Sequence, residues 1–223
     1  MTRNSAQAAA RQGTQPQLPA LRADANTYQP ATILFVDMIG FTAFCAENDP
    51  PTVRTVLQDL LRLLSEQVLA CGGTIEKYLG DGLMARFDGS SFGSRDAANA
   101  VRCGVAMTEK VAQWNASSGR HSESAIRVAI GVHSGSVIIA PVGGSRHGEL
   151  AVFGDTVNIA SRLEGKCRCL DAAILITAQV AEKVVSEGRS DLLGGFAAFG
   201  FHELRGRSGY LHLHGLPRSS SDV

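Results

Sequence analysis

The sequence lacks an excess of either charge, a long apolar run and an ordered set of cysteines. Its 223 residues carry 21 Lys and Arg against 21 Asp and Glu, so the formal net charge is zero. No overall basic field is therefore available to attract nucleic acid or an anionic membrane surface. The chain also has no signal-peptide core and no run of about 18 apolar residues, so we expect no membrane insertion by this chain.

The cysteines exclude a disulfide scaffold. There are five of them at irregular spacing, whereas a disulfide framework usually has an even number. Cys167 and Cys169 are closer together than the usual zinc-binding pair, and no second pair accompanies them. We expect reduced thiols in a cytoplasmic chain, or in the cytoplasmic domain of a longer membrane or sensor protein.

Composition predicts one main domain with flexible ends. A hydrophobic content of 44% over this length suffices for a single full core. Residues 1–29 are rich in Ala, Gln, Thr and Arg and have no apolar period, which is typical of a flexible leader or linker. We expect the folded domain over residues 30–216 and a disordered tail over 217–223. Such a leader indicates that a sensor or membrane module precedes this domain in a longer natural chain.

Hydrophobic periodicity and turn residues predict an α+β fold. The expected elements are a strand over 32–36, a helix capped by Asp49, a hairpin of 74–79 and 83–87, a helix over 95–115, strands over 126–133 and 137–142, a loop over 143–148, a strand over 149–153, a helix capped by Asp155, a strand over 172–176, a helix ending near 186 and a hairpin of 200–204 and 210–214. The order strand, helix, hairpin, helix, strand is the ferredoxin-like split-βαβ plan, with a palm-like sheet covered by helices.

Two aspartates stand where this plan brings distant segments together. Asp37 ends the apolar run 33–36, and Asp81 lies at the tip of the predicted hairpin, between Gly80 and Gly82. The first strand and the hairpin can lie side by side in one sheet, so the two carboxylates can converge. Paired carboxylates of this kind can hold two divalent cations about 4 Å apart. Taken singly, each aspartate is more often an ordinary strand end or a tight turn.

Two further segments suit phosphate chemistry. Ile39, Gly40, Phe41 and Thr42 follow Asp37 at a strand-to-helix turn, where backbone N–H groups can meet phosphate oxygens. A plain turn is the alternative.

The second segment is the helix that follows Gly154, where Asn158 and Arg162 are four residues apart and share one face. A planar guanidinium suits the spread charge of a phosphoryl group. An exposed polar helix face would explain Arg162 alone.

Three blocks of this sequence resemble the signature blocks of class III nucleotide cyclases. They are FVDMIGFT at 35–42, EKYLGDG at 76–82 and FGDTVNIASRL at 153–163, within a similarity that runs from about residue 31 to residue 216. The resemblance implies that Asp37 and Asp81 bind two magnesium or manganese ions, which activate the ribose 3′-hydroxyl for in-line attack on the α-phosphate of ATP. Asn158 would orient the ribose and purine, and Arg162 would stabilise charge on the α-phosphate.

The resemblance also predicts the choice of base, with two departures from the family pattern. Lys77 matches the position that selects the purine. A lysine there indicates adenine, because its ammonium can donate a hydrogen bond to the adenine N1 acceptor. The second selecting position, usually Asp or Thr, is Ala151. Many relatives have an arginine where this chain has Ala129, and Arg127 lies two residues earlier on the same strand face. Arg205 matches a lysine that contacts the triphosphate.

In the family, the metal-binding aspartates of one subunit work with the residues at the positions of Lys77, Asn158, Arg162 and Arg205 in its partner. One chain here carries both sets, so the resemblance implies a homodimer with two equivalent sites that makes 3′,5′-cyclic AMP and pyrophosphate from ATP. A guanylate cyclase is the near alternative because of Ala151. A non-catalytic module with the cyclase fold is the other, although such modules are expected to lose some of these residues. The Gly-Gly-Asp/Glu-Glu-Phe hairpin of diguanylate cyclases is absent.

Overall fold

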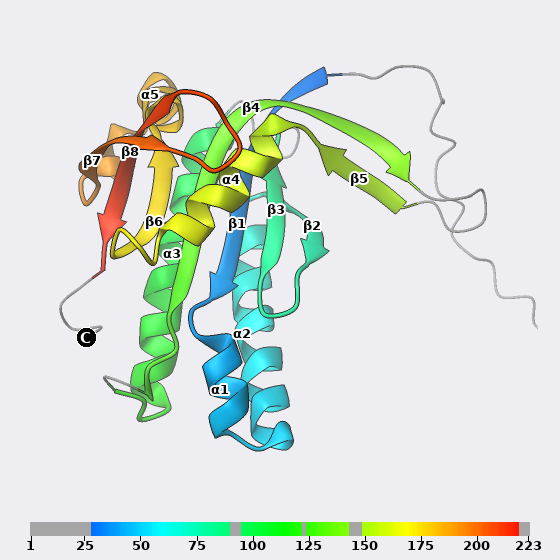
Figure 1. The fold of residues 1–223 in the computed structure, drawn as a ribbon, viewed down its shortest axis with the longest axis vertical. Coiled ribbons are helices and arrows are strands. Elements are labelled where there is room, and N and C mark those ends of the chain that lie inside the picture. Colours follow the sequence, from blue (N-terminus) through cyan, green and yellow to red (C-terminus); the bar gives the residue numbers. More distant parts are fainter. Residues whose placement is uncertain (1–27, 90–94, 122–123, 143–148, 219–223) are drawn as a thin grey trace, which may run out of the picture.

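One mixed sheet organises the fold of the computed structural model (Figure 1). The structure describes residues 28–89, 95–121, 124–142 and 149–218; the predicted leader up to residue 27, the loop over 143–148 and the end of the tail lie outside them. The sheet order is β2-β3-β1-β4-β6-β8-β7, with β5 paired to β4 off this path. The strands are β1 (Tyr28–Met38), β2 (Thr74–Tyr78), β3 (Leu83–Phe87), β4 (Val128–Val142), β5 (Glu149–Phe153), β6 (Ala172–Thr177), β7 (Ala197–Glu203) and β8 (Tyr210–Pro217).

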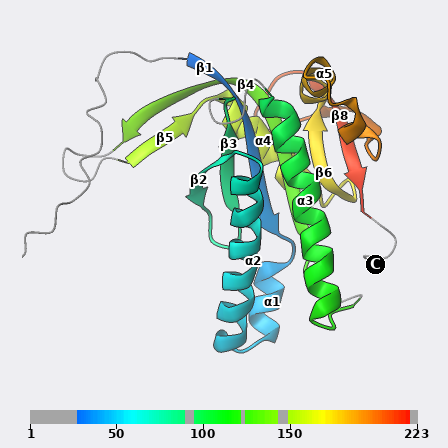
Figure 2. The ribbon, with the colours of Figure 1, turned by 180° about the vertical axis from the view of Figure 1, so that it is seen from behind.

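The helices cover the two faces of the sheet unequally. They are α1 (Phe41–Glu47), α2 (Pro50–Ala70), α3 (Asp96–Ser117), α4 (Asp155–Lys166), α5 (Ala178–Ser186) and a 3₁₀ turn at Ser190–Leu193. Helices α2 and α3 lie behind the sheet in Figure 1 and in front of it in Figure 2, whereas α4 crosses the opposite face. The predicted α+β class and ferredoxin-like core are therefore confirmed, since β1, α2, β2, β3, α3 and β4 follow the expected order.

Helix α2 shows how the sequence directs this packing. The Asp49 carboxylate accepts the Thr52 backbone N–H at 2.8 Å and the Thr52 hydroxyl at 3.0 Å, as an N-cap should. The buried side chains recur every four residues and face the main core, and they are Val56, Leu60, Leu64 and Val68. None of the helices that the structure describes is both long enough and apolar enough to span a membrane.

Several details of the expected elements differ from the structure. Residues 126–133 and 137–142 were expected as two strands, but β4 is continuous because β1 pairs without a break with residues 128–138, across the expected turn. At the expected break, the Thr32 and Ser134 hydroxyls form a buried hydrogen bond of 2.7 Å across the two strands. Helix α1 was not expected, and Gly154 rather than Asp155 is the N-cap residue of α4. Strands β1 and β8 also reach one or two residues beyond the expected domain boundaries.

Helix α4 lies unusually close to strand β4 at Gly131. A Cβ atom at this position would lie 2.3 Å from both the Ala160 carbonyl oxygen and the Glu164 backbone nitrogen. These are backbone atoms of a helix and cannot turn aside as a side chain could. Gly131 therefore sets the height of α4 above the sheet, and with it the position of every functional side chain on that helix.

We expect Gly131→Ala to lower the free energy of unfolding by about 2 kcal/mol or more, because the methyl group would push α4 off the sheet. Gly165→Ala is the matched control: it lies in α4 with no atom within 4 Å of the added Cβ. That substitution should stabilise the protein by about 0.5–1 kcal/mol through helix propensity. Urea unfolding of both variants checks this; equal effects would contradict the close contact.

Candidate active site

The structure brings Asp37 and Asp81 to one cavity. Asp37 lies near the end of β1, opposite Ala129 of β4, and Asp81 lies in the turn between β2 and β3. The cavity has a volume of about 330 Å³ and is lined by Asp37, Met38, Gly40, Phe41, Thr42, Ala43, Asp81 and Arg168. Two of the predicted groups, the aspartate pair and the turn that follows Asp37, thus face the same space.

Gly82 allows the hairpin to come this close. A Cβ atom on Gly82 would lie 2.1 Å from the Val36 carbonyl oxygen and 2.7 Å from Asp37 Oδ1. Any larger residue would push the turn, and Asp81 with it, away from the end of β1. The glycine after Asp81 is therefore needed for the approach of two chain segments as well as for the turn.

The electrostatics of the pair are unfavourable without a cation. Burial, and after it the neighbouring Asp81 carboxylate, raises the pKa of the Asp37 carboxyl to about 6. Asp37 Oδ1 is buried and meets no hydrogen-bond donor in the part of the chain that the structure describes. A buried acceptor without a partner beside a second carboxylate is a poor arrangement by itself.

This donor set fits hard divalent cations. Magnesium prefers oxygen ligands and is usually held by one or two carboxylates together with substrate phosphates, so an all-protein cage is not required. A cation would neutralise both carboxylates and give the unpartnered Asp37 Oδ1 a ligand role. Asp37 and Asp81 would therefore hold the ions, as the sequence predicts.

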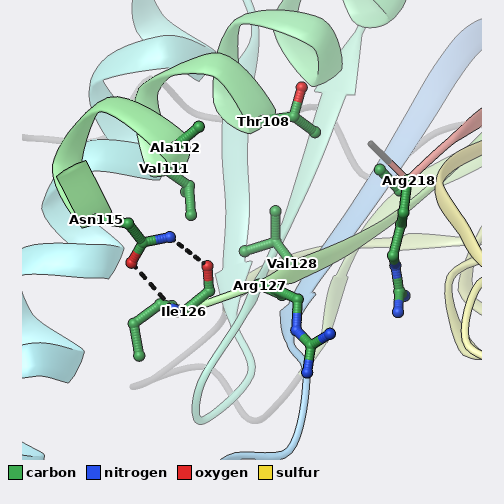
Figure 3. A pocket seen from close by; sticks show the side chains of 9 residues that line it. Thr108, Val111, Ala112, Asn115, Ile126, Arg127, Val128 and Arg218 are labelled. Atoms are coloured by element: carbon green, nitrogen blue, oxygen red, sulfur yellow. Dashed lines mark hydrogen bonds between the residues drawn. The ribbon is translucent and has the colours of Figure 1, made fainter. Parts of the chain in front are cut away.

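The turn after Asp37 is hydrogen-bonded to the residue that precedes β4. The Ile39 backbone N–H donates to the Arg127 carbonyl at 2.8 Å, so that amide is occupied, and Ile39 does not line the cavity. The preceding residue, Ile126, is fixed to α3: the Asn115 side chain donates to its carbonyl at 2.8 Å and accepts its N–H at 3.0 Å (Figure 3). Of the predicted phosphate-binding turn, Gly40, Phe41 and Thr42 line the cavity.

Two charged residues near the aspartates were missed by sequence reasoning. Arg168 lines the cavity, and its charge lowers the pKa of Asp37 against the larger effect of burial. The pKa of Glu164 is raised to about 7, mainly by burial and then by the charges of Asp37 and Asp81, against the opposing charge of Arg168. The available signal was weak: Glu164 follows the buried Ala160 by four residues and precedes the buried Cys167 by three, which places a carboxylate on the inner side of α4.

The second predicted group gathers on α4 and the β7–β8 loop. Asn158 is exposed on α4, and Arg162 is half-buried. A Cβ atom on Gly206 would lie 3.5 Å from an Arg162 guanidinium nitrogen, so the loop that carries Arg205 runs beside Arg162. Arg207 donates a hydrogen bond to Asp155 and ties this loop to the start of the helix.

The base-selecting positions lie on other strands. Lys77 is exposed on β2, where it pairs with Met84 of β3. Ala151 is half-buried on β5, opposite Ala140 of β4. Neither position lines the cavity of Asp37 and Asp81, nor do the three predicted residues of the α4 group, which are Asn158, Arg162 and Arg205. Within one chain, the predicted site residues therefore do not all line one cavity.

Comparison with known proteins finds matches over most of this chain. The family model described as the adenylate and guanylate cyclase catalytic domain matches residues 23–195. Adenylate cyclase 1 of Rhizobium meliloti is 29% identical over 83% of this chain and 27% of its own length. An adenylate cyclase of Anabaena cylindrica is 33% identical over 69% of this chain and 30% of its own length. This chain therefore spans less than a third of either relative.

A solved structure has the same fold. The crystal structure of the adenylyl cyclase CyaB from P. aeruginosa matches with a TM-score of 0.73 and 25% sequence identity, and the match covers 88% of this chain and 98% of that one. The likeness extends over nearly all of the described residues. The mixed sheet and the placement of its helices are therefore those of a known catalytic domain.

The strain at Asp37 predicts a pH-dependent stability. A carboxyl whose pKa is raised in the folded state binds more protons when folded, so stability falls as pH rises from about 4 to about 6. Because asparagine carries no charge, Asp37→Asn should unfold at a temperature roughly 3–8 °C higher than the unchanged protein at pH 8. The difference in melting temperature between the two proteins should shrink as the pH falls from about 6 to about 4.

Thermal unfolding with and without manganese tests this prediction. Manganese should raise the melting temperature of the unchanged protein at pH 8 and leave that of Asp37→Asn unmoved. Asp59→Asn is the control, because Asp59 lies beside Arg62 on the exposed side of α2. A destabilised Asp37→Asn at pH 8 would contradict the unfavourable electrostatics.

Proposed function

The chain belongs to the adenylate and guanylate cyclase catalytic domain family, and we propose that it converts ATP into 3′,5′-cyclic AMP and pyrophosphate. The observation that carries the proposal is the shared cavity of Asp37 and Asp81, which residues 40–43 also line. It combines a site for divalent cations with a turn suited to phosphates. Two relatives that carry the name adenylate cyclase support the reaction type.

Each group of residues has a role that follows from its chemistry. Asp37 and Asp81 would hold two magnesium or manganese ions, whose chemistry there would be to activate the 3′-hydroxyl and to neutralise phosphate charge. The turn at Gly40, Phe41 and Thr42 positions the phosphate chain. Arg162 donates hydrogen bonds to the α-phosphate as its charge grows in the transition state. Asn158 orients the ribose, and Arg205 contacts the triphosphate.

A homodimer would complete the site. The α4 group does not line the aspartate cavity of its own chain, and two copies related by a two-fold axis would each supply half of two equivalent sites. The arm formed by β5 and the outer end of β4 extends away from the sheet (Figure 2). It exposes three large apolar side chains, Val142, Leu150 and Phe153, each more than two-fifths accessible. Such side chains suit a contact with a second copy.

Lys77 favours ATP over GTP. Its exposed ammonium on β2 can donate a hydrogen bond to adenine N1, whereas guanine presents a donor at that position. Ala151 adds no polar side-chain group for the exocyclic amine of adenine, and this observation favours a guanylate cyclase as the second candidate.

A mixture of two inactive variants tests the shared site. Asp37→Ala and Arg162→Ala should each lose roughly 100-fold or more of cyclase activity, because each spoils both sites of its own dimer. After mixing and exchange, half of the dimers are mixed, and each of these has one site with both residues intact. Activity should recover to about a quarter of the unchanged protein. A mixture as inactive as its parents, despite verified subunit exchange, would refute the shared site.

Turnover of ATP and GTP, each with magnesium and with manganese, tests the base preference. We expect ATP to be the better substrate, and Lys77→Glu to shift the ratio of kcat/KM toward GTP by roughly tenfold or more, because glutamate accepts the guanine N1–H. Glu109→Gln on the exposed side of α3 serves as a control for a surface charge change. A preference for GTP in the unchanged protein would make the guanylate cyclase the correct assignment.

A further inference from the structure

Arg168 is the cation of the cavity that holds the two aspartates. It follows α4 in the turn that leads to β6, and its exposed side chain lines the space between Asp37, Asp81 and the backbone of residues 40–43. No other arginine or lysine lines this cavity among the residues that the structure describes. No motif singles out Arg168, which stands between two cysteines outside the recognised blocks.

The turn that carries Arg168 is held firmly in place. The buried Cys167 thiol donates to the Ile130 carbonyl of β4 at 3.3 Å. The Ala172 N–H donates to the Cys167 carbonyl at 3.0 Å and closes the turn. Arg218, which follows β8, also holds the end of this turn. Its backbone N–H donates to the Asp171 carbonyl at 3.2 Å, and its side chain donates to the Ala172 carbonyl at 3.3 Å. The base of the Arg168 side chain therefore needs little ordering when a ligand arrives.

The guanidinium of Arg168 has donors available for a ligand. Its charge acts on Asp37 and Glu164 through space, yet it forms no ion-pair contact with any carboxylate in the described ranges of the chain. Once divalent cations neutralise the aspartates, the strongest remaining partner for a guanidinium in this cavity is an anion that accompanies those cations. A phosphate chain has that charge, and its oxygens match the forked geometry of the guanidinium.

The other nearby positions cannot supply this cation in the same way. Ala129, which faces Asp37 across the strands, has no charge. Arg127 lines the small hollow of Figure 3 together with Arg218, and a second cavity beside α1; Asp37 lines neither. We propose that Arg168 binds the triphosphate chain of the nucleotide, within the cavity of Asp37 and Asp81 of the same chain. This inference rests on the proposed cyclase function.

The test separates binding of the metal from binding of the phosphates. Calorimetry measures the affinity of the full chain for manganese alone and for inorganic triphosphate in the presence of saturating manganese. We expect Arg168→Ala to weaken triphosphate binding roughly 10- to 100-fold, the range for a lost hydrogen bond to a charged group. Manganese alone should bind as tightly as before or more tightly, because a positive charge near both aspartates is gone.

Two further variants sharpen the comparison. Arg168→Lys keeps the charge and loses the fork, so it should recover part of the triphosphate affinity. Arg62→Ala removes an exposed arginine of α2 and should change neither affinity. With ATP as substrate, Arg168→Ala should raise KM by a similar factor.

The alternative role is that Arg168 only offsets the negative charge of Asp37, Asp81 and Glu164. In that case Arg168→Ala would bind manganese more tightly and triphosphate as well as the unchanged protein does, and the proposal would be overturned. Equal weakening of both affinities would also overturn it, because the metal site itself would then depend on Arg168. If the unchanged protein binds triphosphate but forms no cyclic nucleotide, the proposed function fails while the binding comparison still decides the role of Arg168.

Discussion

The repulsion between Asp37 and Asp81 is the constraint on which the rest of this structure depends. Folding places two carboxylates at the end of a buried strand, where one oxygen of Asp37 has no donor among the described residues. Such an arrangement persists only when the surrounding structure fixes it. Here β1 is the strand between β3 and β4, so both of its edges are paired, and Gly82 lets the hairpin turn pack against its end. The sheet therefore stabilises a geometry that the two charges oppose.

The same sheet also fixes the second group of residues. Helix α4 crosses the face opposite α2 and α3, and its contact at Gly131 leaves no room for adjustment. Arg162 lies on α4 and Arg168 lies just beyond its C-terminal end, so the position of the helix fixes both, although only Arg168 lines the cavity of the aspartates. In a two-fold dimer, Arg168 would then serve the site of its own aspartates and Arg162 that of the partner copy.

Local signals in the sequence were sufficient for the features that depend on neighbours along the chain. The cap at Asp49, the helix α2 and the hairpin with Asp81 at its turn each follow from a few adjacent residues, and the structure has all three. The convergence of Asp37 and Asp81 followed from the predicted strand order. The predicted break at Ser134 and Gly135 was wrong. A small polar pair is typical of a turn, whereas here Ser134 faces Thr32 in a buried cross-strand contact.

Arg168 and Glu164 could not be found in that way, because their proximity to Asp37 depends on the path of α4 across β4. That path is set by packing between segments more than thirty residues apart, such as Ile130 and Cys167, and no periodicity in the sequence encodes it. Motif positions identify residues whose role follows from a shared pattern. A charged residue that lines the same cavity from another element can be identified only once the fold is known. Arg168 is such a residue, and it places a positive charge near the aspartates although Ala129 supplies none.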